Sequence, residues 1–104
     1  MRRRDVIGVL DITGSGFKVS SVTVTDTATA LPTTNMDNRK AISIRNWSDG
    51  DVIYIGSSSV TTATGFPIFP KETLPFDLSS GAVIYAICET GKTADVRTIE
   101  VDNG

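Results

Sequence analysis

The sequence contains no histidine, and this absence excludes several kinds of chemistry. Without histidine the chain has no Ser-His-Asp or Cys-His catalysis, no His-ligated metal and no histidine-based pH switch. Cysteine is nearly absent as well, because Cys88 is the only one, so no disulfide forms within the chain. Cys88 ends the apolar run 83–88, which predicts a buried and unreactive thiol. A lone reduced thiol fits a reducing compartment such as the cytoplasm.

Long apolar runs are absent too. No segment approaches the roughly 18 consecutive apolar residues of a transmembrane helix, so we expect no membrane association. Three arginines followed by the apolar run 6–10 imitate the start of a secretory signal. Asp5 and Asp11 flank that short run, however, and no convincing cleavage site follows it. A secreted protein is therefore disfavoured.

The charge of the chain is low and uneven. The formal net charge is −2, and Arg2, Arg3 and Arg4 supply three of the ten basic residues. The remaining chain has seven basic against twelve acidic residues, a net charge of −5. A mildly acidic body does not attract nucleic acid over a broad surface, so we predict no specific nucleic-acid partner. The three arginines are candidates for contact with an acidic protein surface or a phosphate, unless they form a solvated terminus.

The residues that are abundant favour β-structure. The 104 residues include 10 Ser, 14 Thr and nine Gly, and 39% of them are hydrophobic against 21% charged. This length suits one domain, and these fractions argue against wholesale disorder. We expect an extended N-terminal arm over residues 1–16 and a single folded domain over 17–104.

Short apolar or alternating runs recur between turn residues, without any long helical periodicity. Strands are predicted at 5–12, 17–26, 28–32, 39–47, 51–56, 83–90 and 94–101. The Asp49-Gly50 turn predicts a hairpin between 39–47 and 51–56, and residues 89–93 predict a hairpin-like turn between the last two strands. The pattern predicts an all-β fold, a small antiparallel β-sandwich or β-barrel of about seven or eight short strands.

Two features interrupt this pattern. Residues 57–65 form a Ser/Thr-rich stretch around Val60, which we expect to be an exposed loop. Residues 66–79 contain three prolines, which exclude a helix and discourage a central strand. We expect an irregular edge segment there, with its phenylalanines filling the core.

None of the motifs that suggest ligand binding or catalysis is complete. The T13-G14-S15-G16 cluster and the G91-K92-T93 triplet both lack the spacing of a phosphate-binding loop, so each predicts a β-turn. Asp49 and Asp51 lack the further oxygen ligands that calcium requires. No two carboxylates lie in environments that would separate an acid from a base. We therefore predict a non-enzymatic protein without catalytic residues, cofactor or metal.

The seven aromatic residues are the remaining candidates for function. Few basic residues accompany them, unlike the pattern of a nucleic-acid platform. A role in the core or at sheet edges is the first interpretation. Trp47, beside the 48–51 turn, is alternatively an exposed anchor for a protein or a sugar. Phe66 and Phe69 are candidates for protein contact within the Phe/Pro segment.

A series of motifs follows in a fixed order over about residues 22–101: A28-T29-A30-L31-P32, N38-R39-K40-A41-I42-S43-I44-R45-N46, V52-I53-Y54-I55-G56, V60-T61, G65-F66-P67-I68, G81-A82-V83-I84-Y85-A86-I87 and A94-D95-V96-R97-T98-I99-E100. This series resembles small structural proteins of tailed bacteriophage virions. The family pattern usually has Gly where this chain has Asn38. Asn also tolerates positive φ, so the departure is mild.

The resemblance implies a virion protein assembled in the host cytoplasm. Its function would be capsid decoration or cementing through contacts with the major capsid protein or other virion proteins, as a homo-oligomer. A head–tail, neck or tail-fibre component, or a carbohydrate- or receptor-binding module, is the alternative. Ser/Thr-rich strands protect sheet edges less well than charged strands, and an open edge is a docking site. The candidate contact residues are Arg2, Arg3, Arg4, Trp47, Phe66 and Phe69.

Overall fold

The computed structural model describes residues 16–102, which form eight β-strands and no helix. The strands are β1 (Phe17–Val24), β2 (Thr29–Leu31), β3 (Arg39–Asn46), β4 (Ile53–Gly56), β5 (Phe66–Ile68), β6 (Thr73–Phe76), β7 (Ile84–Ile87) and β8 (Ala94–Asp102). The predicted all-β fold of seven or eight short strands is confirmed. No membrane-spanning helix occurs within this described range. The strand predicted at 5–12 and the arm before Gly16 lie outside it.

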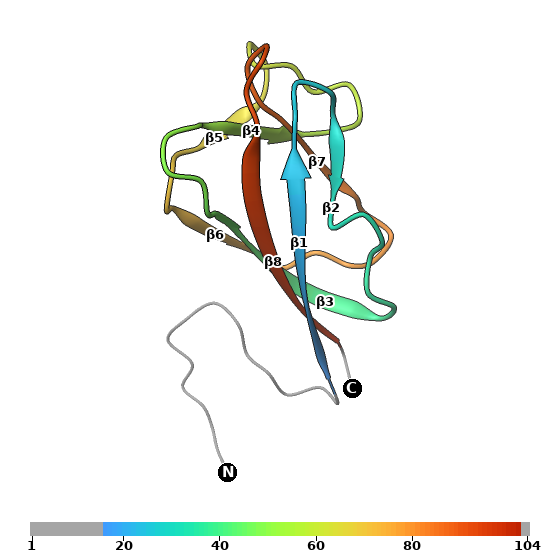
Figure 1. Cartoon of the computed structure of the whole chain (residues 1–104). Coiled ribbons are helices and arrows are strands. Elements are labelled where there is room, and N and C mark those ends of the chain that lie inside the picture. Colours follow the sequence, from blue (N-terminus) through green and yellow to red (C-terminus); the bar gives the residue numbers. More distant parts are fainter. Residues whose placement is uncertain (1–15, 103–104) are drawn as a thin grey trace.

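The strands form two antiparallel four-stranded sheets, ordered β1-β8-β3-β6 and β2-β7-β4-β5 (Figure 1). The chain pairs with itself from its ends inwards, because β1 pairs with β8, β2 with β7, β3 with β6 and β4 with β5. This nested pairing, distributed over two sheets, is the strand order of an eight-stranded jelly roll. The sandwich alternative of the sequence prediction is therefore the correct one.

The core between the sheets is aliphatic. Both sheets contribute to one cluster: Val22, Val24, Leu31, Ile42, Ile44, Ile53, Ile55, Ile68, Ala86, Cys88, Ala94 and Val96. Ile42 and Ile44 alternate along β3 and are fully buried, as their spacing predicts. None of the seven aromatic side chains is fully buried. The prediction that the phenylalanines of 66–79 fill the core is wrong for Phe66 and Phe69.

The hairpin predicted between 39–47 and 51–56 is wrong, because β3 and β4 belong to different sheets. Asn46 redirects the chain between them. Its buried side-chain amide donates to the carbonyls of Asp51 and Ile68, both at 2.8 Å, and its Oδ1 accepts from the backbone and hydroxyl of Ser48. The Asp-Gly sequence thus lies in a sheet-to-sheet corner, where a side chain replaces the hydrogen bonds of a hairpin turn.

The turn predicted at 89–93 is present, closed by a backbone hydrogen bond across 89–92, but it joins no hairpin, because β7 and β8 also belong to different sheets. The connection is tied instead to the loop after β1. The backbone N–H of Cys88 donates to the carbonyl of Thr25, and that of Gly91 donates to Asp26 Oδ2 at 3.0 Å. Gly91 has a φ of 78°, a conformation that glycine adopts without steric cost.

The Phe/Pro segment lies at sheet edges, as its prolines predict, but it forms two short strands where an irregular segment was expected. β5 lies at the edge of one sheet and β6 at the edge of the other. The turn between them, residues 69–72, is held against the end of β3: Lys71 N–H donates to the carbonyl of Asn46 at 2.7 Å, and Asn46 N–H donates to that of Glu72 at 3.0 Å. This segment carries two of the predicted contact residues.

Candidate protein-contact surface

Four of the seven aromatic side chains are strongly exposed. The exposed fractions are 58% for Phe17, 44% for Trp47, 59% for Phe66 and 53% for Phe69. Single exposed apolar residues are ordinary, but aromatic residues are enriched at protein interfaces and scarce on surfaces that stay in water. The exposed aromatic set is therefore the strongest sign of function on the described surface.

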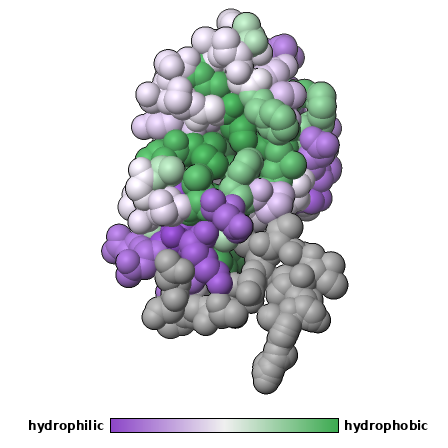
Figure 2. Space-filling view, turned by 180° about the vertical axis from the view of Figure 1, so that it is seen from behind, coloured by the Kyte–Doolittle hydropathy of each residue, from purple (hydrophilic) through white to green (hydrophobic). Residues whose placement is uncertain are grey.

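Phe66 lies at the rim of an apolar hollow of about 390 Å³. Residues from both sheets and from the loop after β6 line it: Ile55, Gly56, Phe66, Phe76, Leu78 and Ile84. Figure 2 shows hydrophobic residues gathered across the middle of the face turned away from the viewer in Figure 1. An apolar concavity with an aromatic rim is suited to receiving an apolar side chain of a partner.

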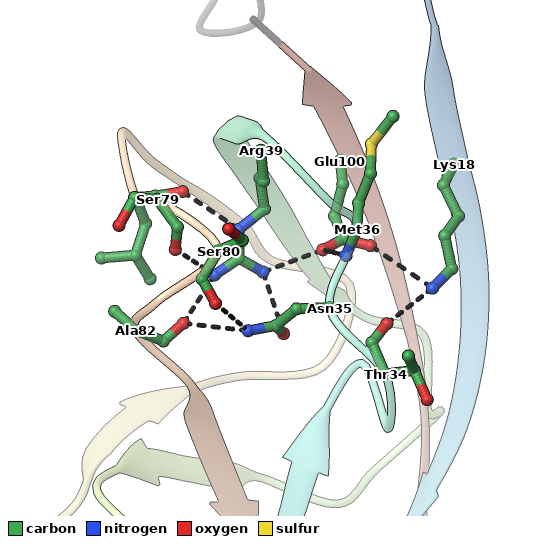
Figure 3. A network of polar contacts seen from close by, with 10 residues as sticks. Lys18, Thr34, Asn35, Met36, Arg39, Ser79, Ser80, Ala82 and Glu100 are labelled. Carbon is green, nitrogen blue, oxygen red and sulfur yellow. Dashed lines mark hydrogen bonds and ion pairs between the residues drawn. The ribbon is translucent and has the colours of Figure 1, made fainter.

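A buried polar network fixes the loop that forms one wall of this hollow (Figure 3). Arg39 uses all five of its N–H donors. They bond to Asn35 Oδ1 (3.2 Å), Glu100 Oε2 (2.8 Å) and the carbonyls of Leu78 (3.0 Å), Ser79 (2.8 Å) and Ala82 (2.6 Å). Since Leu78 lines the hollow, the guanidinium group holds the wall of the hollow in place.

Glu100 is the buried anionic partner in this network. Its Oε2 also accepts the backbone N–H of Met36 at 3.0 Å, and its Oε1 lies 4.0 Å from Lys18 Nζ. The Arg39 and Glu100 side chains are both fully buried. This ion pair was not predicted from the sequence. The feature that could have indicated it is the position of Glu100, which continues the inward-facing alternation of β8 from Val96, where a buried carboxylate needs a partner.

Asn38 precedes Arg39 in the same loop and has a φ of 55°. Asparagine tolerates this left-handed conformation better than most residues, as expected for the position where the resembling pattern has Gly. The loop 33–38 therefore reaches β3 in the conformation that lets Asn35 and Met36 join the network.

Trp47 lies outside the core at the end of β3, as its position beside a turn allowed. Lys71 Nζ lies 3.9 Å from the centre of its ring, and the Arg45 guanidinium lies 5.3 Å from it. Lys71 Nζ also donates to the Trp47 carbonyl at 2.8 Å and lies 3.4 Å from Asp49. Cations therefore already contact the indole face, which a sugar would otherwise stack on.

The predicted contact residues fall into separate groups. Phe69 and Lys71 share the 69–72 turn, which brings Phe69 to the Trp47 end of the sheet, whereas Phe66 belongs to the hollow. Tyr54, a further partly exposed aromatic residue, lies on β4, in the other sheet from β3, which Trp47 follows. Arg2, Arg3 and Arg4 lie outside the described residues.

Cys88 is buried, as predicted, and its Sγ lies 3.6 Å from the carbonyl of Val24. Burial, reinforced by the charges of Asp51, Asp26 and Glu89, raises the pKa of the thiol to about 11. The thiol is therefore protonated at neutral pH and is a poor nucleophile. Residues 16–102 contain no group of three or more Cys, Asp or Glu side chains placed to hold a metal ion.

No protein-family model, curated protein or solved structure matches this chain. The fold alone therefore defines the structural class of the protein. It is a small all-β sandwich with the strand order of a jelly roll, an aliphatic core and aromatic side chains on its surface.

Proposed function

We propose that the protein is a non-enzymatic structural component of a tailed-bacteriophage virion that decorates or cements the capsid. The observation that carries the proposal is the strong exposure of four of the seven aromatic side chains, Phe17, Trp47, Phe66 and Phe69, around an aliphatic core. Large aromatic residues dominate the energetics of protein contacts, so their placement outside the core suits a protein whose work is binding other proteins. The location in a virion is inferred from the motif resemblance. The jelly-roll strand order is consistent with it, since viral capsid domains use this fold.

In this proposal the hollow beside Phe66 receives an apolar side chain of a capsid protein. The described surface offers an apolar wall from Phe76, Leu78 and Ile84, and the Arg39 network keeps that wall rigid. A rigid, preformed pocket loses little conformational entropy on binding, which favours tight attachment. Phe69 and Trp47 provide a second contact region at the neighbouring end of the sheet.

A tail or neck position would use the same surface, and the number of copies per particle distinguishes these positions. A carbohydrate-binding role is less favoured, because Lys71 and Arg45 already contact the Trp47 ring. That role predicts sugar-dependent quenching of Trp47 fluorescence, and the capsid role predicts none across a broad glycan panel.

The first test is the copy number of the protein in purified virions of the source phage, measured by quantitative mass spectrometry. Hundreds of copies per particle would support capsid decoration. A small multiple of three, five, six or twelve would overturn decoration in favour of a vertex, neck or tail component. Absence from the particle would overturn the virion role itself.

The second test locates the contact surface. Purified protein is added back to particles that lack it, and the bound fraction is measured by sedimentation. We expect Phe66→Ser to weaken binding at least tenfold, while the apolar Phe66→Leu retains most of it; an alanine-type truncation at an interface hot spot costs about 2 kcal/mol or more. Since Phe66 is exposed, both variants should fold like the parent, which circular dichroism checks. Unchanged binding of Phe66→Ser would remove the hollow from the interface.

A further inference from the structure

The four edges of the two sheets differ in how they are protected against pairing with another strand. β5 contains Pro67 and β6 contains Pro75, while β2 has only three residues and is followed by Pro32. Proline on an edge strand removes a donor and blocks strand addition. β1 has eight residues and no proline, and within the described chain it pairs with β8 alone. One long edge is therefore left without this protection.

The hydrogen-bond pattern shows which groups of β1 face outwards. Asp102 N–H donates to the carbonyl of Gly16, so the even-numbered residues of β1 face β8. Trp47 N–H donates to the carbonyl of Asp95, so the odd-numbered residues of β8 face β3, which agrees with this assignment. The N–H and C=O groups of Phe17, Val19, Ser21 and Thr23 therefore point away from β8, along the outer edge.

Pro75 lies at an outward-facing position of the edge strand β6. Asn46 N–H donates to the carbonyl of Glu72, so the even-numbered residues of β6 face β3. Pro75 then occupies a position whose N–H would otherwise point outwards. One edge of this sheet is thus closed by a proline at an outward-facing position, whereas the opposite edge at β1 presents four such positions without one.

β1 also lacks a charged outer face. Lys18 is its only charged residue, and the Lys18 ammonium is occupied by the carbonyl of Thr34 at 2.6 Å. The side chains beside the open edge are those of Phe17, Val19, Ser21 and Thr23, all exposed, with Val19 at 62%. Natural edge strands commonly carry an outward lysine against unwanted pairing, and β1 has none on this face.

We propose that β1 is a self-association edge, along which a second copy of this chain pairs its own β1 in antiparallel orientation. A twofold axis perpendicular to the sheet produces this pairing and keeps the outer faces of both copies on one side. Phe17 and Val19 of the two copies then join a single apolar patch, continued by Ile99, which lies beside Val19 on β8. No like charges meet in the pair, so the strand is complementary to itself. The inference rests on the edge and does not depend on the virion role.

The test uses the full-length chain and compares Val19→Lys with Val83→Lys, which makes the same substitution at an exposed valine away from β1. Sedimentation equilibrium should show a dimer for the parent and for Val83→Lys. It should show a rise of at least about tenfold in the dimer dissociation constant for Val19→Lys. Pairing of all four outward positions places Phe17 opposite Thr23 and Val19 opposite Ser21, so the two new lysines would lie diagonally across the pair, within reach of each other. A parent that stays monomeric over the measured concentrations, or a Val19→Lys variant that dimerises normally, would overturn the proposal.

Hydrogen exchange distinguishes strand pairing from simple apolar contact. In the dimer the amides of residues 17, 19, 21 and 23 should exchange slowly, and they should exchange faster on dilution or in Val19→Lys. The amides of residues 18, 20, 22 and 24 should stay protected throughout, because they bond to β8. Fast exchange at the odd positions in a proven dimer would contradict the pairing. Protection of the odd positions in a monomer would mean that another segment of the same chain covers the edge, and would also overturn the proposal.

Discussion

Removing the Arg39 guanidinium should be among the most damaging single changes in this protein. Arg39→Met keeps the length and apolar stem of the side chain but removes five hydrogen-bond donors and one positive charge. Three backbone carbonyls, of Leu78, Ser79 and Ala82, then lose the donor that Arg39 supplies, and the Glu100 carboxylate loses its buried counterion. Breaking a buried ion pair from one side costs about 3 to 5 kcal/mol, because an uncompensated charge remains.

This loss is large compared with the whole stability of a small domain, roughly 5 to 15 kcal/mol. The measurement is urea unfolding followed by the near-ultraviolet signal of Trp47, with the free energy of unfolding extrapolated to water. We expect the midpoint to fall while the slope m stays constant, which would show that the native state has lost stability without changing its compactness.

Two further variants test the charge and the hydrogen bonds of Arg39 separately. Arg39→Lys keeps the charge but has three donors in place of five, so we expect a loss between those of the parent and Arg39→Met. Combining Arg39→Met with Glu100→Leu removes the stranded carboxylate, so the double variant should be more stable than Arg39→Met alone. A loss below about 1 kcal/mol in Arg39→Met would refute the network as a stabilising element. So would a double variant that loses the full sum of the two single changes.

Three other predictions test the core and its connections. Ile44→Asp should prevent folding, since it places an unpaired charge at a fully buried position; a soluble variant with an unchanged melting temperature would contradict this. Cys88 should react slowly with a bulky thiol reagent until the protein unfolds. The free energy of unfolding should fall as the pH rises from about 9 to about 11, because in that range the thiol ionises only in the unfolded chain. Cys88→Ala should reduce this pH dependence. Gly65→Ala should cost about 1 to 3 kcal/mol by thermal unfolding, because the new Cβ would lie 2.6 Å from Tyr54 Cβ, whereas Gly50→Ala, with nothing within 4 Å, should have almost no effect.

Most strands could be predicted from the sequence, except β5 and β6 in the Phe/Pro segment, but the pairing of the strands could not. Alternation of β-branched and polar residues located β1, β3 and β8, because burial of one face imposes a period of two on each strand. Strand pairing was predicted from proximity along the chain, since neighbouring strands usually pair. In this topology only β4 and β5 are both consecutive and paired. The connection that moves the chain from one sheet to the other after β3 depends on the buried side chain of Asn46. One of its hydrogen-bond partners, Ile68, is 22 residues away in the sequence.

The exposed aromatic surface was predictable in part. Trp47, Phe66 and Phe69 were selected as contact residues, and all three are exposed. The interpretation of the aromatics as core or sheet-edge residues holds for Phe76, which packs against the core from an edge strand. It is wrong that phenylalanines fill the core, because branched aliphatic side chains already occupy the space between the sheets. Phe17 was not among the predicted contact residues, although the alternation of β1, with Val22 and Val24 facing the core, places the odd-numbered Phe17 on the outer face.

The aromatic surface and the open edge of β1 have the same thermodynamic consequence. The isolated chain leaves apolar area in water that a larger core would have buried, and burial contributes about 25 cal/mol for each Å² of apolar surface removed from water. Binding that requires the folded state adds its free energy to the stability of that state. Attachment through Phe66 or pairing through β1 should therefore raise the melting temperature, and pairing should make it depend on protein concentration. In either case the folded state would gain part of its stability from the neighbouring molecule.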